Sequence, residues 1–323
     1  MTIVHQTVDA NGIRLHLAEA GPVSGPLVLL CHGFPESWYS WRHQIEALAA
    51  AGYRAVAPDM RGYGNTDAPE AIDQYSMFHL VGDMVGVLDA LKTDQAVIVG
   101  HDWGAPVAWN SALYRPDRFR AVAGLSVPFN PRGAARPTSN MPATDEAVFY
   151  QTYFQTPGIA EAEFERDVRA TIRGFQFLWS GDARATSAGQ HTMVPRNAGF
   201  LTGAPAVEEL PAWVSEQDLD FYAGEFQRSG FRGPLNWYRN MDRNWEQGAP
   251  WAGAKISVPA LYMVGEHDMV RTFRGVDRLI PNLEMFVPHL REKLVVPSAG
   301  HWLQRERPNE VNAALLRFLA SLA

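Results

Sequence analysis

The sequence has a single cysteine, Cys31, among its 323 residues. One thiol excludes an internal disulfide and a metal site built from cysteines, and it is typical of a protein in a reducing compartment. No apolar run approaches the roughly 20 residues that a membrane-spanning helix requires. Residues 1–10 also lack the basic and apolar segments of a signal peptide. These absences predict a cytoplasmic protein without a membrane span.

Basic residues are the minority among the charged ones, with 28 Lys and Arg against 35 Asp and Glu, so the formal net charge is −7. An acidic balance argues against nucleic acid or an anionic membrane as the main partner. The hydrophobic share of 46% is that of an ordinary globular chain rather than a disordered one. The length fits one large domain or a core with a sizeable insertion.

Strand and helix signals alternate along the first 130 residues and return near the end of the chain. The expected strands include a hairpin around the turn Asn11-Gly12, then residues 26–31, 53–57, 95–100, 121–127, 258–264 and 292–296. The expected helices here are residues 41–51, 77–91 and 309–322. Such alternation predicts an α/β fold with a mostly parallel sheet covered by helices on both faces.

The middle of the chain has a different character. From about residue 130 to 253 strand signals disappear, aromatic residues become frequent, and residues 160–177 and 215–227 show helical patterns. We therefore expect two units: a core of residues 1–129 and 254–323, and a helical cap of residues 130–253 that lies over the sheet.

The stretch Val-Gly-His-Asp-Trp-Gly-Ala, residues 99–105, follows the expected strand 95–100 and leads into a helix start. Its small-x-acid-x-small spacing is that of a nucleophile elbow, with Asp102 where serine is usual. Asp268 follows the strand 258–264 and His301 follows the strand 292–296. This order of nucleophile, acid and histidine is that of the α/β-hydrolase triad. Taken alone, Asp102 could instead be a helix N-cap.

An aspartate at this position points to attack on an electrophilic sp³ carbon. Serine would form an ether that water does not cleave, whereas a carboxylate forms an ester. Water activated by His301, with Asp268 orienting the ring, can then attack the carbonyl of Asp102 and regenerate the enzyme. The amides of Phe34, in the loop after the strand 26–31, and of Trp103 are expected to form the oxyanion hole for that step.

The sequence resembles the soluble epoxide hydrolases of the α/β-hydrolase superfamily along nearly its whole length. The matching stretches are His32-Gly33-Phe34-Pro35-Glu36, residues 59–64, Gly100-His101-Asp102-Trp103-Gly104, residues 153–158, residues 230–240 and Gly300-His301-Trp302. The resemblance implies an eight-stranded, mostly parallel sheet with an inserted helical cap, no cofactor and no metal. It also implies a small-molecule epoxide as substrate and suggests a homodimer.

The resemblance further implies two cap tyrosines that donate hydrogen bonds to the epoxide oxygen, which map onto Tyr153 and Tyr238. Tyr150, three residues before Tyr153, is the alternative on the same helical face. A neutral phenol suits this task, because opening an epoxide generates an alkoxide that needs a proton or a strong donor.

The substrate-binding surface is expected to include His32, Pro35 and Trp103 beside these tyrosines. We expect His32 to order its loop through hydrogen bonds rather than to transfer protons. Two other functions stay open from the residues. A haloalkane or haloacid dehalogenase would use the same triad with a halide cradle, and a binding protein on this fold would have lost turnover.

Overall fold

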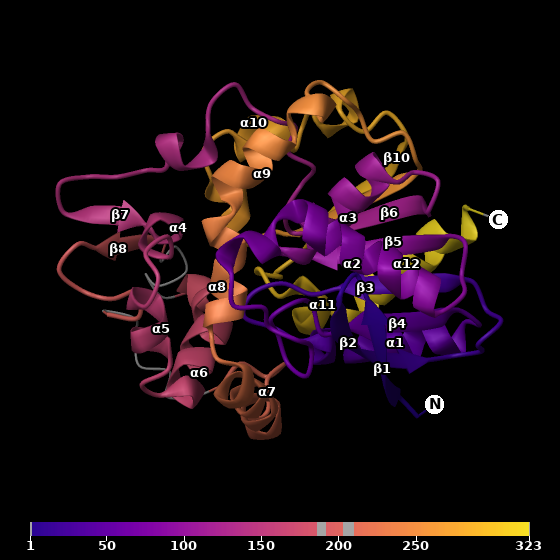
Figure 1. Cartoon of the computed structure of the whole chain (residues 1–323), viewed down its shortest axis with the longest axis horizontal. Helices are drawn as coiled ribbons and strands as arrows, with labels where there is room; N and C mark the ends of the chain where they lie inside the picture. The colour runs from indigo at the N-terminus through magenta and orange to yellow at the C-terminus, as the bar shows by residue number, and fades with distance from the viewer. Residues whose placement is uncertain (1, 186–191, 203–209, 323) are drawn as a thin grey trace.

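The computed structural model describes residues 2–185, 192–202 and 210–322, and a twisted eight-stranded sheet forms its centre (Figure 1). The strand order is β1-β2-β4-β3-β5-β6-β9-β10. The pairs β1–β2 and β2–β4 are antiparallel, and the remaining neighbours are parallel. The strands are β1 Val4–Ala10, β2 Ile13–Ala20, β3 Leu27–Cys31, β4 Arg54–Pro58, β5 Ala96–His101, β6 Phe119–Leu125, β9 Ala260–Gly265 and β10 Leu290–Val296. The predicted fold class is confirmed.

Both faces of the sheet are buried, because alternate residues of the central strands pack into two separate cores. Leu27 and Leu29 of β3 pack into the core that contains α2 (Met77–Ala90) and α3 (Gly104–Tyr114). Val28 and Leu30 pack into the core that contains α1 (Arg42–Ala50) and α12 (Pro308–Ala320). A parallel sheet buried on both sides needs apolar residues at successive positions, which explains the continuous apolar run of β3.

Residues between β6 and β9 form a separate group of mainly helical elements, at the left of Figure 1. The helices are α4 Tyr150–Tyr153, α5 Ile159–Phe164, α6 Val168–Leu178, α7 Glu216–Ser229, α8 Arg232–Arg239 and α9 Met241–Gln247. The helix expected over residues 160–177 is divided in two, and Asp167 begins the second part by accepting a hydrogen bond from the amide of Ala170.

The expectation that residues 130–253 contain no strands is wrong for one small two-stranded sheet. Strand β7 (Ala147–Phe149) pairs antiparallel with β8 (Met193–Pro195). The boundaries of the cap at residues 130 and 253 stay a prediction. No helix within the described ranges is long and apolar enough to cross a membrane.

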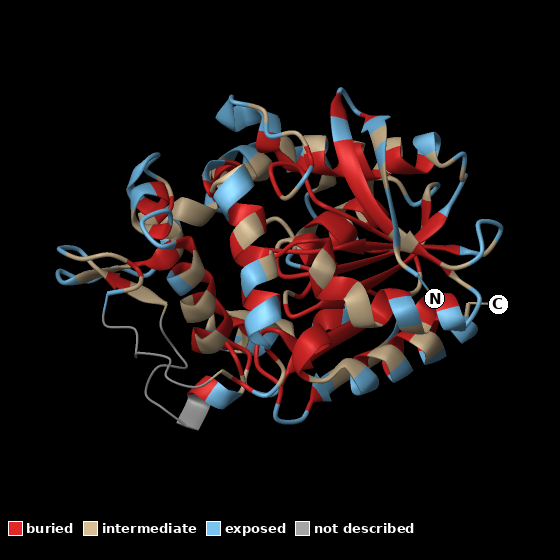
Figure 2. Cartoon of the chain, turned by 90° about the horizontal axis from the view of Figure 1, so that it is seen from below, coloured by how far each residue is buried: buried red, intermediate tan, exposed pale blue. Residues whose placement is uncertain are grey.

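Aromatic residues join the helical group to the sheet. The ring of Phe34, in the loop after β3, contacts the rings of Phe154, Phe175, Phe231 and Tyr238 from the helical group. Figure 2 shows that the strands and the inner sides of the helices are buried, whereas exposed residues lie mainly on the outer helices and loops. The residues predicted to carry the chemistry follow strands at this same junction. Two short helices, α10 (Val276–Leu279) and α11 (Leu303–Glu306), follow β9 and β10 in the chain.

Candidate active site

A strained turn between β5 and α3 carries Asp102. Its backbone has φ 49°, in the left-handed region that non-glycine residues seldom adopt. The turn is so tight that a Cβ added at Gly100 would lie 1.9 Å from the carbonyl oxygen of Gly104, and one at Gly104 would lie 2.0 Å from that of Cys31. Only glycine fits at both positions. This geometry is that of a nucleophile elbow, and it projects Asp102 beyond the end of the sheet.

The structure brings the three predicted triad residues together. His301 Nε2 lies 3.3 Å from Asp102 Oδ2, and His301 Nδ1 lies 3.1 Å from Asp268 Oδ1. The exposed fractions are 7% for Asp102, 2% for Asp268 and 0% for His301. Because each residue follows a parallel strand of the same sheet, the three side chains meet at one edge.

Electrostatics couples the members of this triad. Burial alone would lower the pKa of His301, but the charge of Asp268, the hydrogen bond with Asp268 and the interaction with Asp102 raise it to about 10. Burial would raise the pKa of Asp268, but the His301 charge and hydrogen bonds from His301, Ser126 and the Val270 amide hold it below its usual range. The raised pKa favours the imidazolium form of His301 before substrate binds.

The loop after β3 faces the nucleophile. The amide of Phe34 donates a hydrogen bond of 2.7 Å to Asp102 Oδ1, and the Phe34–Pro35 peptide bond is cis. A Cβ at Gly33 would lie 2.3 Å from Asp102 Oδ1, so glycine is required for this close approach. Trp103 follows Asp102 and caps α3. The two residues predicted for the oxyanion hole thus flank Asp102.

His32 lies behind this loop rather than on the cavity wall. Its Nε2 accepts a hydrogen bond of 3.0 Å from the amide of Met60, so its Nδ1 donates to the carbonyl oxygen of Gly33 at 2.9 Å. The ring is fully buried. These contacts fit the expected role of ordering the loop. Neither His32 nor Pro35 is among the residues that line the cavity described below.

Tyr238, on α8, lies beside the nucleophile. Its ring contacts Trp103 with centroids 5.1 Å apart and Phe34 at 5.5 Å. Burial raises the pKa of Tyr238 well above its usual range, and the charge of Asp102 adds to this rise. The side chain of Trp103 acts against this rise in the pKa. No acceptor for the phenolic proton of Tyr238 lies among the described residues, so the proton is left for another acceptor.

The second predicted tyrosine, Tyr153, does not reach this site. It is half-buried at the end of α4, and its hydroxyl donates to Glu163 Oε2 at 2.9 Å. Tyr150 at the start of α4 is fully buried and contacts the ring of Tyr238 at 6.1 Å. Tyr150 lines the cavity described below and Tyr153 does not, because the Tyr153 hydroxyl is held by Glu163 instead.

The hydroxyl of Tyr150 accepts a hydrogen bond of 3.0 Å from Gln151 Nε2, and no acceptor for its own proton lies among the described residues. Burial raises the pKa of Tyr150, and the charge of Asp102 raises it further, so the phenol keeps its proton at neutral pH. The sequence named Tyr150 only as the alternative to Tyr153, and the direction of each side chain in α4 decides between them.

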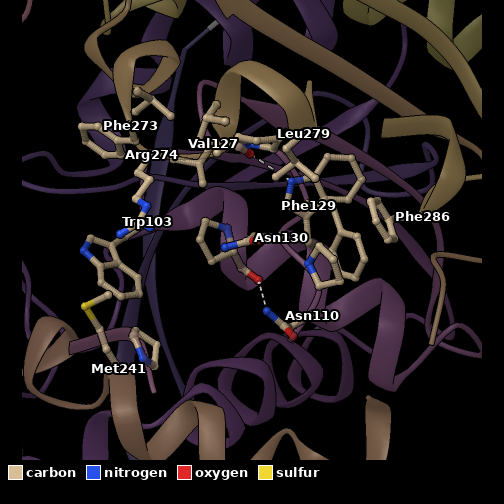
Figure 3. Close-up of a pocket in the computed structure, with 18 of the residues that line it drawn as sticks. Trp103, Asn110, Val127, Phe129, Asn130, Met241, Phe273, Arg274, Leu279 and Phe286 are labelled. Carbon is tan, nitrogen blue, oxygen red and sulfur yellow. Dashed lines mark hydrogen bonds between the residues drawn. The ribbon is translucent and has the colours of Figure 1, made fainter. Parts of the chain in front are cut away.

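A cavity of about 820 Å³ opens from the nucleophile. Figure 3 shows Trp103 and Met241 at one end and Phe286 at the other, with Phe129 and Asn130 between them. Asp102 and Tyr150 also line it, and most of the remaining lining residues are apolar. A cavity of this size and character accepts an apolar small molecule.

The sequence reasoning did not assign a role to Glu36, which supports the site from behind. Its carboxylate lies 2.8 Å from Nδ1 of His101 and accepts a hydrogen bond from Gln304. Burial opposes ionisation, but His101 and Arg305 lower the pKa of Glu36 to about 2. His101 Nε2 in turn lies 2.7 Å from the carbonyl oxygen of His301. The motif His32-Gly33-Phe34-Pro35-Glu36 could be identified in the sequence. The contact of Glu36 with His101, 65 positions away, could not be predicted from it.

Comparison with known proteins identifies the class first. A family model described as the alpha/beta hydrolase fold matches residues 26–308, and the elbow, triad and sheet order described above are those of that fold. Among curated proteins, epoxide hydrolase A of Mycobacterium tuberculosis is 50% identical over 318 residues, which cover 98% of this chain and 97% of that protein. Bifunctional epoxide hydrolase 2 of Sus scrofa is 44% identical over 95% of this chain, which corresponds to 53% of its own length.

The solved structures that resemble this chain are also epoxide hydrolases. An epoxide hydrolase from an endophytic Streptomyces has a TM-score of 0.94 at 49% identity and covers 99% of this chain and 96% of its own. Epoxide hydrolase A from Mycobacterium thermoresistibile has a TM-score of 0.91 at 46% identity, with 99% and 98% coverage. The chain belongs to the epoxide hydrolases of the α/β-hydrolase fold, as the resemblance in its sequence predicts.

Proposed function

We propose that this protein hydrolyses an apolar epoxide to a vicinal diol through an ester between the substrate and Asp102. The observation that carries the proposal is the pair of phenols, Tyr150 and Tyr238, whose protons are unused beside a carboxylate nucleophile. This arrangement favours an epoxide over an alkyl halide.

In the first half of the reaction, Tyr150 and Tyr238 donate hydrogen bonds to the epoxide oxygen. Asp102 Oδ1 is held by the amide of Phe34, so Oδ1 becomes the carbonyl oxygen of the ester and Oδ2 is the attacking atom. Attack on a ring carbon forms the C–O bond of the ester and breaks the C–O bond of the epoxide. The leaving alkoxide takes a proton from a tyrosine.

In the second half, water attacks the carbonyl carbon of Asp102. His301 takes the water proton on Nε2, and Asp268 stabilises the imidazolium that forms. The negative charge on Oδ1 is held by the amides of Phe34 and Trp103. In the collapse of the tetrahedral intermediate the ester bond breaks, and the leaving oxygen takes the proton from His301 to complete the diol. The proton left on the Asp102 carboxyl then moves to His301, which restores the carboxylate. No redox step or cofactor enters this balance.

The test is product analysis with an aryl epoxide and a bromoalkane in parallel. Diol without bromide is the expected result, and bromide without diol would favour a dehalogenase. A single turnover in H₂¹⁸O with excess enzyme separates the covalent route from direct attack by water. We expect unlabelled diol and one ¹⁸O atom in the peptide that contains Asp102. Label in the diol after that first turnover would contradict the ester.

Two further expectations complete the proposal. The lone thiol favours a cytoplasmic location, and the family resemblance suggests a homodimer. Light scattering on the purified protein at several concentrations tests the dimer. Neither expectation changes the chemistry proposed for the site, because every residue assigned to it belongs to one chain.

A further inference from the structure

His301 has a second partner on the side away from the nucleophile. Ser126 Oγ lies 3.1 Å from His301 Nδ1, the same distance as Asp268 Oδ1. The Ser126 hydroxyl also helps to hold the pKa of the Asp268 carboxyl below its usual range. A lone pair of the hydroxyl oxygen can accept from Nδ1–H beside the Asp268 carboxylate. The three side chains thus form one buried group.

The backbone of Ser126 is strained in this position. The residue follows β6 with φ 68°, an uncommon conformation for a residue other than glycine. Its amide donates to the carbonyl oxygen of Met263 at 2.8 Å, and its own carbonyl accepts from the hydroxyl of Tyr262 at 2.8 Å. Strain in a fully buried residue that is fixed at both ends by hydrogen bonds is the kind that accumulates at functional sites.

The two halves of the reaction place different demands on His301. In the resting protein, Asp102 Oδ2 holds Nε2 at 3.3 Å while Asp268 and Ser126 hold Nδ1. Ester formation removes the charge of Asp102, so the Nε2 contact is weakened when His301 must aim Nε2 at water. The ring orientation then depends on the Nδ1 partners and on packing against Trp179, whose centroid lies 5.6 Å away.

We propose that Ser126 is a positioning residue for the hydrolytic half of the reaction, in which its hydroxyl fixes the plane of the His301 ring while Asp102 is esterified. This inference rests on the proposed function. Ser126 touches neither the substrate nor Asp102 and acts only through His301 and Asp268. Epoxide opening, in which His301 moves no proton, does not require it.

The experiment measures the two half-reactions separately, by rapid-quench analysis of alkyl-enzyme and diol with an aryl epoxide. Ser126→Ala removes the hydroxyl, and Ser126→Gly removes it and also relieves the backbone strain, so a folding defect in one variant does not stop the test. Loss of a hydrogen bond to a charged ring predicts an approximately tenfold slower hydrolysis. The alkylation rate stays unchanged, and the alkyl-enzyme accumulates in intact-protein mass spectra.

Ser126→Asn is the rescue variant, because asparagine tolerates the left-handed region and keeps a donor and an acceptor; it should recover most of the hydrolysis rate. Ser111→Ala is the matched control, since Ser111 is buried in α3 and its hydroxyl has no partner among the described residues. It should leave both half-reactions unchanged.

Hydrolysis at the wild-type rate in both Ser126→Ala and Ser126→Gly would overturn the inference. So would an equal fall in alkylation and hydrolysis, which is the signature of a purely structural role. Failure of the proposed function is recognised earlier, in the wild-type protein, as diol formation without a covalent intermediate; that result overturns both.

Discussion

Substitution of Tyr150 by phenylalanine tests the tyrosine assignment that the sequence left open. The change removes the hydroxyl and keeps the buried ring that packs against Tyr238. Removing one preorganised donor to a developing oxyanion costs about 10²–10³ in rate. Because Tyr238 remains, we expect the lower end, about 100-fold in the alkylation rate, which corresponds to about 2.7 kcal/mol. The hydroxyl also accepts from Gln151, so stability falls by only about 1 kcal/mol.

Tyr153→Phe is the matched control on the same helix. It removes the hydrogen bond to Glu163, whose carboxylate keeps the amides of Phe200 and Leu201 as partners at 2.9 Å each. Stopped-flow single turnovers of an aryl epoxide measure alkylation in both variants, and thermal unfolding reports their stability. We expect Tyr153→Phe to alkylate close to the wild-type rate. The reverse pattern, with Tyr153→Phe slow and Tyr150→Phe unaffected, would refute the reasoning.

Three further predictions concern the nucleophile turn and its histidine. Gly104→Ala places a Cβ 2.0 Å from the Cys31 carbonyl oxygen, so we expect a loss of at least about 1–3 kcal/mol of stability and of turnover; an active variant of wild-type Tm would contradict this. His301→Gln removes the base but not the nucleophile, and the covalent ester should accumulate in intact-mass spectra, whereas recovery of only unmodified protein would count against the ester. Asp102→Asn removes a group that raises the pKa of His301 to about 10, so NMR titration of that ring should give a lower pKa. The stability that the raised pKa of His301 contributes is fully present below about pH 6.5 and is lost as the pH rises through about 10. The wild type and Asp102→Asn should therefore converge in stability at alkaline pH. The same pKa of His301 in both proteins would contradict this prediction.

The positions of the triad could be predicted because they depend on strand ends. Asp102, Asp268 and His301 each follow a strand with a clear apolar pattern, and parallel strands bring their carboxyl ends to one edge. Gly100 and Gly104, on either side of Asp102, could be predicted equally well, because a tight elbow leaves no room for a Cβ. Where a rule of backbone geometry fixes a position, a single sequence is sufficient.

Side-chain directions and long-range contacts could not be predicted in this way. Tyr150 and Tyr153 lie one turn apart in a four-residue helix, and a motif cannot show which ring faces Asp102. The pairing of β7 with β8 joins residues more than 40 positions apart, and both strands have only three residues. Such short strands give too little periodicity to be distinguished from loops.

The charge of Asp102 links the two halves of the proposed reaction. In the resting protein that charge and Asp268 together keep His301 protonated, because both carboxylates favour the imidazolium. Alkylation converts Asp102 to a neutral ester and removes one of the two. The pKa of His301 then falls, the ring gives its proton to the tyrosinate that epoxide opening has left, and Nε2 becomes a base at the moment when the ester needs water. A serine nucleophile carries no charge in its resting state and could not switch its histidine in this way. The aspartate therefore supplies both a cleavable ester and the electrostatic change that activates its cleavage.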